Sequence, residues 1–255
     1  MGMADGRVVL VTGAGGGIGR AAAGLFAEEG AAHVALADRD EATANDTADL
    51  VRASGAGASV HVFDVTDEQS VAAFVDRVVA DQGRIHSAFN NAGISHPSVP
   101  FHELAREAWD EMLEVNLTSV FLCMKHEIRQ MLDTGTAGAI VNTSSGAGVV
   151  PAPGQPHYTA AEHAVLGLTR CAASEYVKSG SRCNSILPGM VDTPMLTGGT
   201  GVLGERAAAL LARVSPTGEL LQPAQIAAVA VWLCSDSADA VNGQAIVADG
   251  GGIMR

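Results

Sequence analysis

The sequence predicts one doubly wound α/β domain, in which a parallel sheet is covered by helices on both faces. Short apolar segments alternate with longer segments of helical periodicity from one end of the chain to the other. Strands that are separated by helices of ten or more residues form βαβ units, and these units require a parallel sheet. The length of 255 residues suits one large domain, and 47% hydrophobic residues with only 4% aromatic ones indicate a sizeable aliphatic core. No repeat or linker divides the chain, so residues 1–255 are predicted to form a single domain.

Seven segments are predicted as strands. The first, Val8 to Val11, is apolar at every position, which is typical of a strand that is covered on both faces. The others are expected at residues 34–37, 60–63, 85–89, 139–143, 182–187 and 245–247.

The segments between these strands show helical spacing. After the first strand, Ile18, Ala22 and Leu25 form an apolar stripe. Further helices are predicted up to about residue 54, from about 71 to 83, and over 103–132, 156–178, 205–213 and 223–234. The loop over 197–204 contains four glycines, and we interpret it as a flexible segment that closes over a substrate.

Composition excludes several classes of function. A formal charge of −13 repels a phosphate backbone, so nucleic acid is not an expected partner. No apolar run reaches the ~18 residues that span a bilayer, and no signal peptide is visible, so we expect a cytoplasmic protein without a membrane partner. The four cysteines show no C-x-x-C spacing and are expected to be buried and reduced. The eight histidines show no ligand spacing with acids, and no metal site is predicted.

A glycine-rich turn, Thr12-Gly13-Ala14-Gly15-Gly16-Gly17-Ile18-Gly19, connects the first strand to the first helix. Glycines let backbone N–H groups approach a pyrophosphate, and the helix N-terminus adds partial positive charge. A turn of this kind also occurs without a ligand, but here it stands in the strand–turn–helix context that a dinucleotide requires. The predicted cofactor-binding residues in this turn are Gly13, Gly17, Ile18 and Gly19.

An acid follows at the end of the second strand. Asp38 lies 19 residues beyond Gly19, where a carboxylate accepts hydrogen bonds from ribose hydroxyls and repels a 2′-phosphate. Asp38 therefore favours NAD as the cofactor. Arg39 keeps NADP open as the alternative, because a guanidinium there is able to pair with the phosphate. An N-cap role for Asp38 in the following helix is compatible with ribose binding.

Further motifs occur in a fixed order along the chain: Asp64-Val65, Asn90-Asn91-Ala92-Gly93, Asn116, Ser144-Ser145, Tyr158, Pro188-Gly189 with Val191 and Thr193, and Asp249-Gly250-Gly251. With the turn over 12–19, these motifs resemble those of the classical short-chain dehydrogenases/reductases along almost the whole chain. The resemblance implies a Rossmann-type fold and an NAD-dependent oxidoreductase. It also implies that Asp64 and Val65 hold the adenine and that Asn91 and Gly93 line the adenosine side of the cofactor cleft. Val191 and Thr193 would contact the nicotinamide carboxamide.

The same resemblance assigns three catalytic residues. Ser145, which precedes Tyr158 by 13 residues, would bind the substrate oxygen. Tyr158 would be the general acid/base and would also contact the cofactor, and Asn116 would anchor a water of the proton relay. The chemistry agrees, because hydride transfer to a carbonyl builds alkoxide charge that needs a proton donor and a second hydrogen bond. Without a ligand, Tyr158 would be a packing residue and Ser145 a cap.

One position departs from the family pattern. The family motif is Tyr-x-x-x-Lys, whereas this chain has Glu162 four residues after Tyr158. Residues at i and i+4 share a helix face, so Glu162 is expected where the ammonium would lie and to raise the pKa of Tyr158. His163 is about 100° further round the helix and does not replace the lysine.

Three interpretations of Glu162 stay open. The chain is a variant of an ordinary dehydrogenase with impaired activity, an enzyme with a modified relay, or an NAD-binding sensor with little catalysis. Ser181, at a position that suits an aliphatic residue, is a second weak departure.

The expected substrate pocket is neutral. Segments 95–99, 147–155 and 190–203 contain no Lys or Arg, which favours a small neutral alcohol or ketone over a phosphorylated substrate. Similar proteins are homotetramers or homodimers that pair two long helices, and residues 103–132 and 156–178 would serve this purpose.

Overall fold

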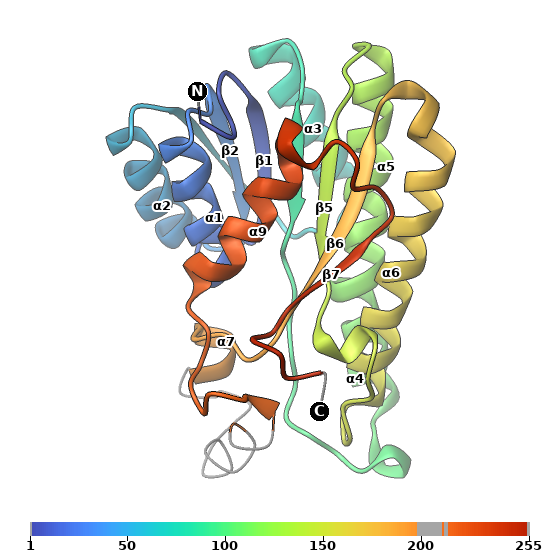
Figure 1. Cartoon of the computed structure of the whole chain (residues 1–255). Coiled ribbons are helices and arrows are strands. Elements are labelled where there is room, and N and C mark those ends of the chain that lie inside the picture. Colours follow the sequence, from blue (N-terminus) through green and yellow to red (C-terminus); the bar gives the residue numbers. More distant parts are fainter. Residues whose placement is uncertain (1, 198–210, 212–213, 254–255) are drawn as a thin grey trace.

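The computed structural model describes residues 2–197, 211 and 214–253. It contains a seven-stranded sheet in the order β3-β2-β1-β4-β5-β6-β7, and every neighbouring pair of strands is parallel (Figure 1). The strands are β1 (Val8–Thr12), β2 (His33–Asp38), β3 (Gly57–Val62), β4 (Ser87–Asn90), β5 (Ala139–Thr143), β6 (Arg182–Pro188) and β7 (Ala245–Ala248). The prediction of a doubly wound parallel sheet is confirmed, and all seven predicted segments overlap a strand.

Helices cover both faces of this sheet (Figure 1). Their bounds are α1 (Gly17–Glu28), α2 (Glu41–Ala53), α3 (Glu68–Gln82), α4 (Arg106–Leu113), α5 (Ser119–Asp133), α6 (Pro156–Tyr176), α7 (Pro194–Thr197) and α9 (Pro223–Cys234). Short 3₁₀ turns lie at Phe101–Glu103, Gly146–Gly148, Val177–Ser179 and Asp236–Ala238. The predicted helix over 205–213 and the glycine-rich loop over 197–204 fall almost wholly outside the described residues.

Two hydrophobic cores lie on opposite faces of the sheet, and β1 contributes to both. Val9 and Val11 pack in the core that contains the buried faces of α1 and α9. Val8 and Leu10 pack in the other core, with residues of α3, α5 and α6. Successive side chains of a strand point to opposite faces, and this explains why a strand buried on both sides is apolar at every position.

The helical stretch predicted over 103–132 is confirmed from residue 106 onward, but it is not a uniform α-helix. A π-helical turn, Glu114–Thr118, separates α4 from α5. Within it, Asn116 Oδ1 accepts from the Ile94 amide at 2.8 Å and Nδ2 donates to the Ile94 carbonyl at 3.0 Å. These two bonds fix the π turn against the segment that follows β4. π turns inside α-helices are frequent at functional sites.

The burial of each cysteine depends on which side of its helix or strand the residue faces. Cys123, Cys183 and Cys234 are buried, as expected, but Cys171 is exposed, so the prediction of burial is wrong for it. On α6 the next two residues, Ala172 and Ala173, face the core, and position 171 consequently points outward.

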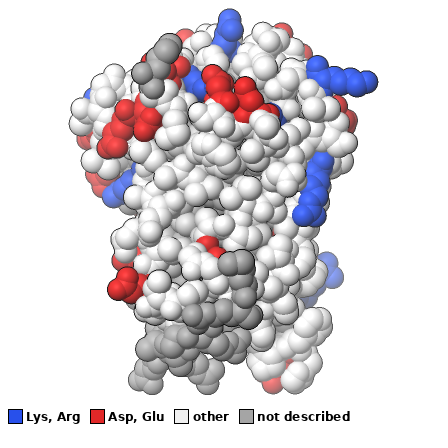
Figure 2. All heavy atoms as spheres, in the orientation of Figure 1, with Lys and Arg blue, Asp and Glu red and all other residues white. Residues whose placement is uncertain are grey.

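Charged side chains are unevenly spread on the face shown in Figure 2. They gather toward one end and along the edges, and the middle of this face carries few of them. Among the described residues, no helix is both long and apolar enough to cross a bilayer.

Candidate active site

A cavity of about 1560 Å³ opens at the carboxyl ends of the central strands. The strand order reverses between β1 and β4, and ligands of doubly wound sheets bind at such a point. The volume exceeds the range of roughly 300–1000 Å³ that is typical for one small ligand, so a dinucleotide and a substrate have room side by side. Most of the site residues predicted from the sequence line this cavity: Gly13, Gly17, Ile18, Asp38, Asn91, Gly93, Asn116, Ser145, Tyr158, Val191 and Thr193.

The glycine turn has the shape that a phosphate cradle needs. A Cβ on Gly19 would lie 2.1 Å from the Gly13 carbonyl oxygen, so α1 packs directly on the turn. Gly19 therefore does not line the cavity itself. Gly16, in contrast, has open space within 4 Å of its Cβ position, and its backbone is accessible from the cavity. The residues fit a pyrophosphate at the N-terminus of α1.

Asp38 is held beside this turn at the end of β2. Its Oδ2 accepts from the Gly15 amide at 2.7 Å, and its Oδ1 accepts from the Asp40 amide at 3.0 Å. The N-cap of α2 is Asp40, whose side chain accepts from the Thr43 amide at 3.0 Å. The N-cap interpretation of Asp38 is therefore wrong, and its carboxylate lines the cavity.

Asp64 and Val65 lie next to this end of the cavity but do not line it. They follow β3, the strand beside β2. Asp64 Oδ1 accepts from the amide and the hydroxyl of Thr66 at 2.9 and 2.8 Å, and Val65 is buried. Their contact with an adenine stays a prediction.

Thr193 lies over the glycine turn. A Cβ on Gly17 would be 3.0 Å from Thr193 Cγ2. Val191 is buried two residues earlier, in a short parallel bridge with Leu221. This segment and the N-terminus of α1 thus form one end of the cavity.

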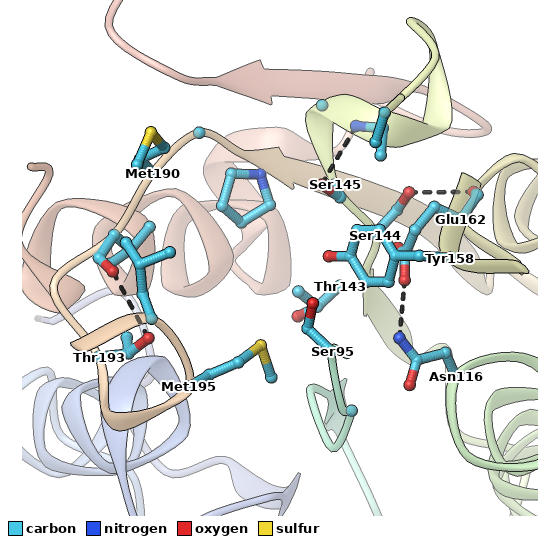
Figure 3. A pocket seen from close by; sticks show the side chains of 18 of the residues that line it. Ser95, Asn116, Thr143, Ser144, Ser145, Tyr158, Glu162, Met190, Thr193 and Met195 are labelled. Atoms are coloured by element: carbon cyan, nitrogen blue, oxygen red, sulfur yellow. Dashed lines mark hydrogen bonds between the residues drawn. The ribbon is translucent and has the colours of Figure 1, made fainter. Parts of the chain in front are cut away.

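Ser145 and Tyr158 converge on the cavity from different elements (Figure 3). Ser145 follows β5, and its Oγ accepts from the Ala147 amide at 3.1 Å, so its hydroxyl hydrogen is directed to the side of Tyr158. Tyr158 comes from the first turn of α6. Burial raises the pKa of the Tyr158 phenol well above its ordinary value, the Glu162 carboxyl raises this pKa further, and the Ser145 hydroxyl lowers it.

Glu162 occupies the same helix face one turn later. Its side chain is only 4% exposed, and Oε1 accepts from Asn116 Nδ2 at 3.0 Å (Figure 3). Burial raises the pKa of this carboxyl to about 7, and the bond from Asn116 lowers it in part. His163 is exposed, with its ring against the Thr159 carbonyl, so it does not face the cavity. Among the described residues that line the cavity there is no Lys or Arg.

The substrate side of the cavity is largely the one expected. The predicted segments contribute Ser95, Val150, Gln155, Met190, Met195 and Leu196 to its wall. His96 and His157 do not line it, because His157 is buried and its ring lies against that of His96.

One part of the cavity wall, the segment after β7, was not predicted from the sequence. Asp249, Gly252 and Ile253, after β7, also line the cavity. The Asp-Gly-Gly motif was the only signal for this segment in the sequence. Asp249 accepts from the amides of Gly251 and Ile253 at 2.8 and 2.6 Å, which holds residues 249–253 in a tight turn at the cavity wall.

Comparison with known proteins agrees with this fold. A family model described as enoyl-(acyl carrier protein) reductase matches residues 13–252. The chain is 42% identical over 250 residues to the 2,5-dichloro-2,5-cyclohexadiene-1,4-diol dehydrogenase of Sphingobium indicum, with 97% of each chain covered. It is 44% identical over 245 residues to the cis-4-hydroxycyclohexanecarboxylate dehydrogenase of Sinomonas cyclohexanicum, with 96% of each chain covered. The crystal structure of a levodione reductase superimposes with a TM-score of 0.93 at 35% identity and covers 98% of each chain.

Fold, cavity and relatives together define an oxidoreductase of the Rossmann type. The chain belongs to the short-chain dehydrogenase/reductase family, as its motifs indicated.

Proposed function

We propose that the protein transfers a hydride between NAD and a small, neutral secondary alcohol or ketone. The observation that carries this proposal is the convergence of Ser145 and Tyr158 on one cavity with the glycine turn and Asp38. Three relatives bear names that refer to a hydroxylated six-membered ring, including the cyclohexanol dehydrogenase of an Acinetobacter species. A cyclic secondary alcohol is accordingly the preferred substrate.

The proposed mechanism uses three side chains. NAD, when bound, supplies the hydride acceptor. Ser145 donates its hydroxyl hydrogen to the substrate oxygen and holds that oxygen beside Tyr158. In oxidation the Tyr158 phenolate takes the hydroxyl proton of the substrate and becomes the phenol, and in reduction the phenol returns this proton to the substrate oxygen. Asn116 acts behind Tyr158, where its amide bonds Glu162 and the Ile94 backbone.

Asp38 supports NAD over NADP. Its carboxylate is fixed by the Gly15 amide at the place where the adenosine ribose would lie, and it would repel a 2′-phosphate there. Arg39, the residue that kept NADP open, is exposed. We further propose a cytoplasmic protein that forms a homotetramer or homodimer through the outer faces of α5 and α6, on which Phe121, Leu132 and Val177 beside the end of α6 are exposed.

A second candidate function is an NAD-binding sensor with little or no catalysis. The buried carboxyl of Glu162 favours this candidate. It raises the pKa of Tyr158, whereas a tyrosine that acts as a base near neutral pH needs a lowered pKa. A protein with this function would bind NAD in the same cofactor site, but Tyr158 would not transfer a proton.

One pair of measurements separates the two functions. Nicotinamide absorbance is followed with NAD and NADP over a panel of cyclic and linear secondary alcohols and ketones, and NAD binding is measured by calorimetry. Turnover with NAD supports the dehydrogenase, and binding without turnover supports the sensor. If neither nucleotide binds, both functions are refuted.

A further inference from the structure

Gln155 and Ser95 form a polar pair on the substrate side of the cavity. Gln155 precedes the first residue of α6, and Ser95 lies in the segment after β4. Gln155 Nε2 donates to Ser95 Oγ at 3.1 Å and to the backbone carbonyl of His96 at 2.5 Å. Both side chains line the same cavity as Tyr158, and in the view of Figure 3 Ser95 lies between Met195 and Tyr158.

The two bonds fix the orientation of the amide. A backbone carbonyl only accepts hydrogen bonds, so the nitrogen of Gln155, and not its oxygen, must face His96. Both hydrogens of this nitrogen are then used. No donor among the described residues bonds Gln155 Oε1, so this oxygen remains as an acceptor.

Ser95 can still donate a hydrogen bond, which complements the acceptor on Gln155. Its oxygen accepts from Gln155, and among the described residues no acceptor takes its hydroxyl hydrogen. The pair therefore offers one acceptor, Gln155 Oε1, beside one donor, the Ser95 hydroxyl. An alcohol group can donate to the first and accept from the second, whereas an ether or a ketone can only accept.

We infer that Gln155 and Ser95 recognise a second hydroxyl group on the substrate, so that the preferred substrates are cyclic diols. This inference rests on the proposed function. Gln155 is the N-cap residue of α6, three residues before Tyr158, and both side chains line one cavity, so one ring can present one hydroxyl to Tyr158 and another to Gln155. A ring without the donor covers Gln155 Oε1 and leaves it unpaired, and such a loss discriminates between substrates.

The test compares diols with their monomethyl ethers, which keep the second oxygen but not its hydrogen. The protein is saturated with NADH, so that alcohols bind without reacting, and the cyclohexane-1,2-, 1,3- and 1,4-diols and their ethers are titrated by calorimetry. We expect at least one diol to bind about tenfold more tightly than its ether, which is the upper end of the net value of one neutral hydrogen bond.

Variants then test whether Gln155 and Ser95 cause the preference for diols. Gln155→Met keeps the length of the side chain and removes the acceptor, and it should reduce the diol-to-ether ratio to within about twofold. Ser95→Ala should reduce it as well, and it guards against a Gln155→Met protein that fails to fold. Gln69→Met, on the exposed start of α3, is the matched control and should retain the tenfold ratio.

Equal binding of every diol and its ether by the unchanged protein would refute the inference, as would a full diol preference in a folded Gln155→Met protein. Failure of the proposed function looks different. In that case NADH does not bind, or no secondary alcohol is oxidised although the diol preference in binding persists.

Discussion

Replacement of Glu162 by lysine is expected to raise the turnover of secondary alcohols with NAD at least tenfold. For side chains one helical turn apart, two unit charges about 5 Å from each other interact by roughly 3 kcal/mol at an effective dielectric constant of about 20. This energy corresponds to about two pKa units. Lysine removes the repulsion and adds an attraction, so the pKa of Tyr158 should fall. A tenfold change in rate needs only about 1.4 kcal/mol.

The gain should also depend on pH in a defined direction. The pKa of Glu162 is raised to about 7, so its carboxyl is largely neutral near pH 6 and largely ionised near pH 8. The repulsion on Tyr158 therefore grows as pH rises through this range. The ratio of kcat/KM between Glu162→Lys and the unchanged protein should accordingly be larger at about pH 8 than at about pH 6.

Two variants make this experiment specific. Glu162→Gln removes the charge without adding one and should fall between the other two proteins. His163→Lys adds the same positive charge to the exposed neighbour, and its kcat/KM should change less than twofold. A Glu162→Lys protein with normal melting temperature and NAD affinity that gains less than twofold would refute the reasoning.

Three further outcomes are expected. Tyr158→Phe should lower kcat by at least about a hundredfold, which steady-state kinetics would measure, because proton transfer of this kind contributes roughly 10²–10⁴ in rate; a smaller loss would contradict its role as the acid/base. Asp38→Asn should raise the affinity for NADP relative to NAD at least about tenfold in calorimetric titrations, and an unchanged ratio would remove Asp38 from the explanation of cofactor choice. Glu127 is only 1% exposed, and burial raises its pKa to about 7 from 4.5, so the folded state holds this proton and loses stability as pH rises from about 5 to about 8. The free energy of unfolding is measured with urea at about pH 5 and about pH 8. Its decrease between these pH values should be smaller in Glu127→Gln than in the unchanged protein by an amount on the order of 2–3 kcal/mol. The exposed Glu107→Gln should show the same decrease as the unchanged protein.

The sheet could be predicted from sequence because its information is local. A run such as Val8 to Val11 shows by itself that both faces of the strand are covered, and β1 indeed contributes to both cores. The π turn at Asn116 could not be predicted in this way. It depends on hydrogen bonds to Ile94, 22 residues earlier, and no periodicity within the helix contains that contact.

The candidate site likewise has parts that local sequence predicts and parts that depend on contacts between distant segments. The glycine turn, Ser145 and Tyr158 carry recognisable spacing, and the structure brings them to one cavity. The sequence allowed Asp38 to be the N-cap of α2 as well as a ribose ligand, and only the geometry shows that Asp40 caps α2 while Asp38 faces the cavity. The orientation of the Gln155 amide is likewise a tertiary property, because it is fixed by a carbonyl of a distant segment.

The distribution of the four cysteines has a practical consequence. Burial raises the pKa of the thiols of Cys123, Cys183 and Cys234, which keeps them protonated and unreactive, whereas Cys171 is exposed on α6. A maleimide dye should therefore label one position per chain without any engineering. If copies of the chain associate through α6, the dye would react slowly with the assembled protein and rapidly after dilution, so a native thiol would report on assembly.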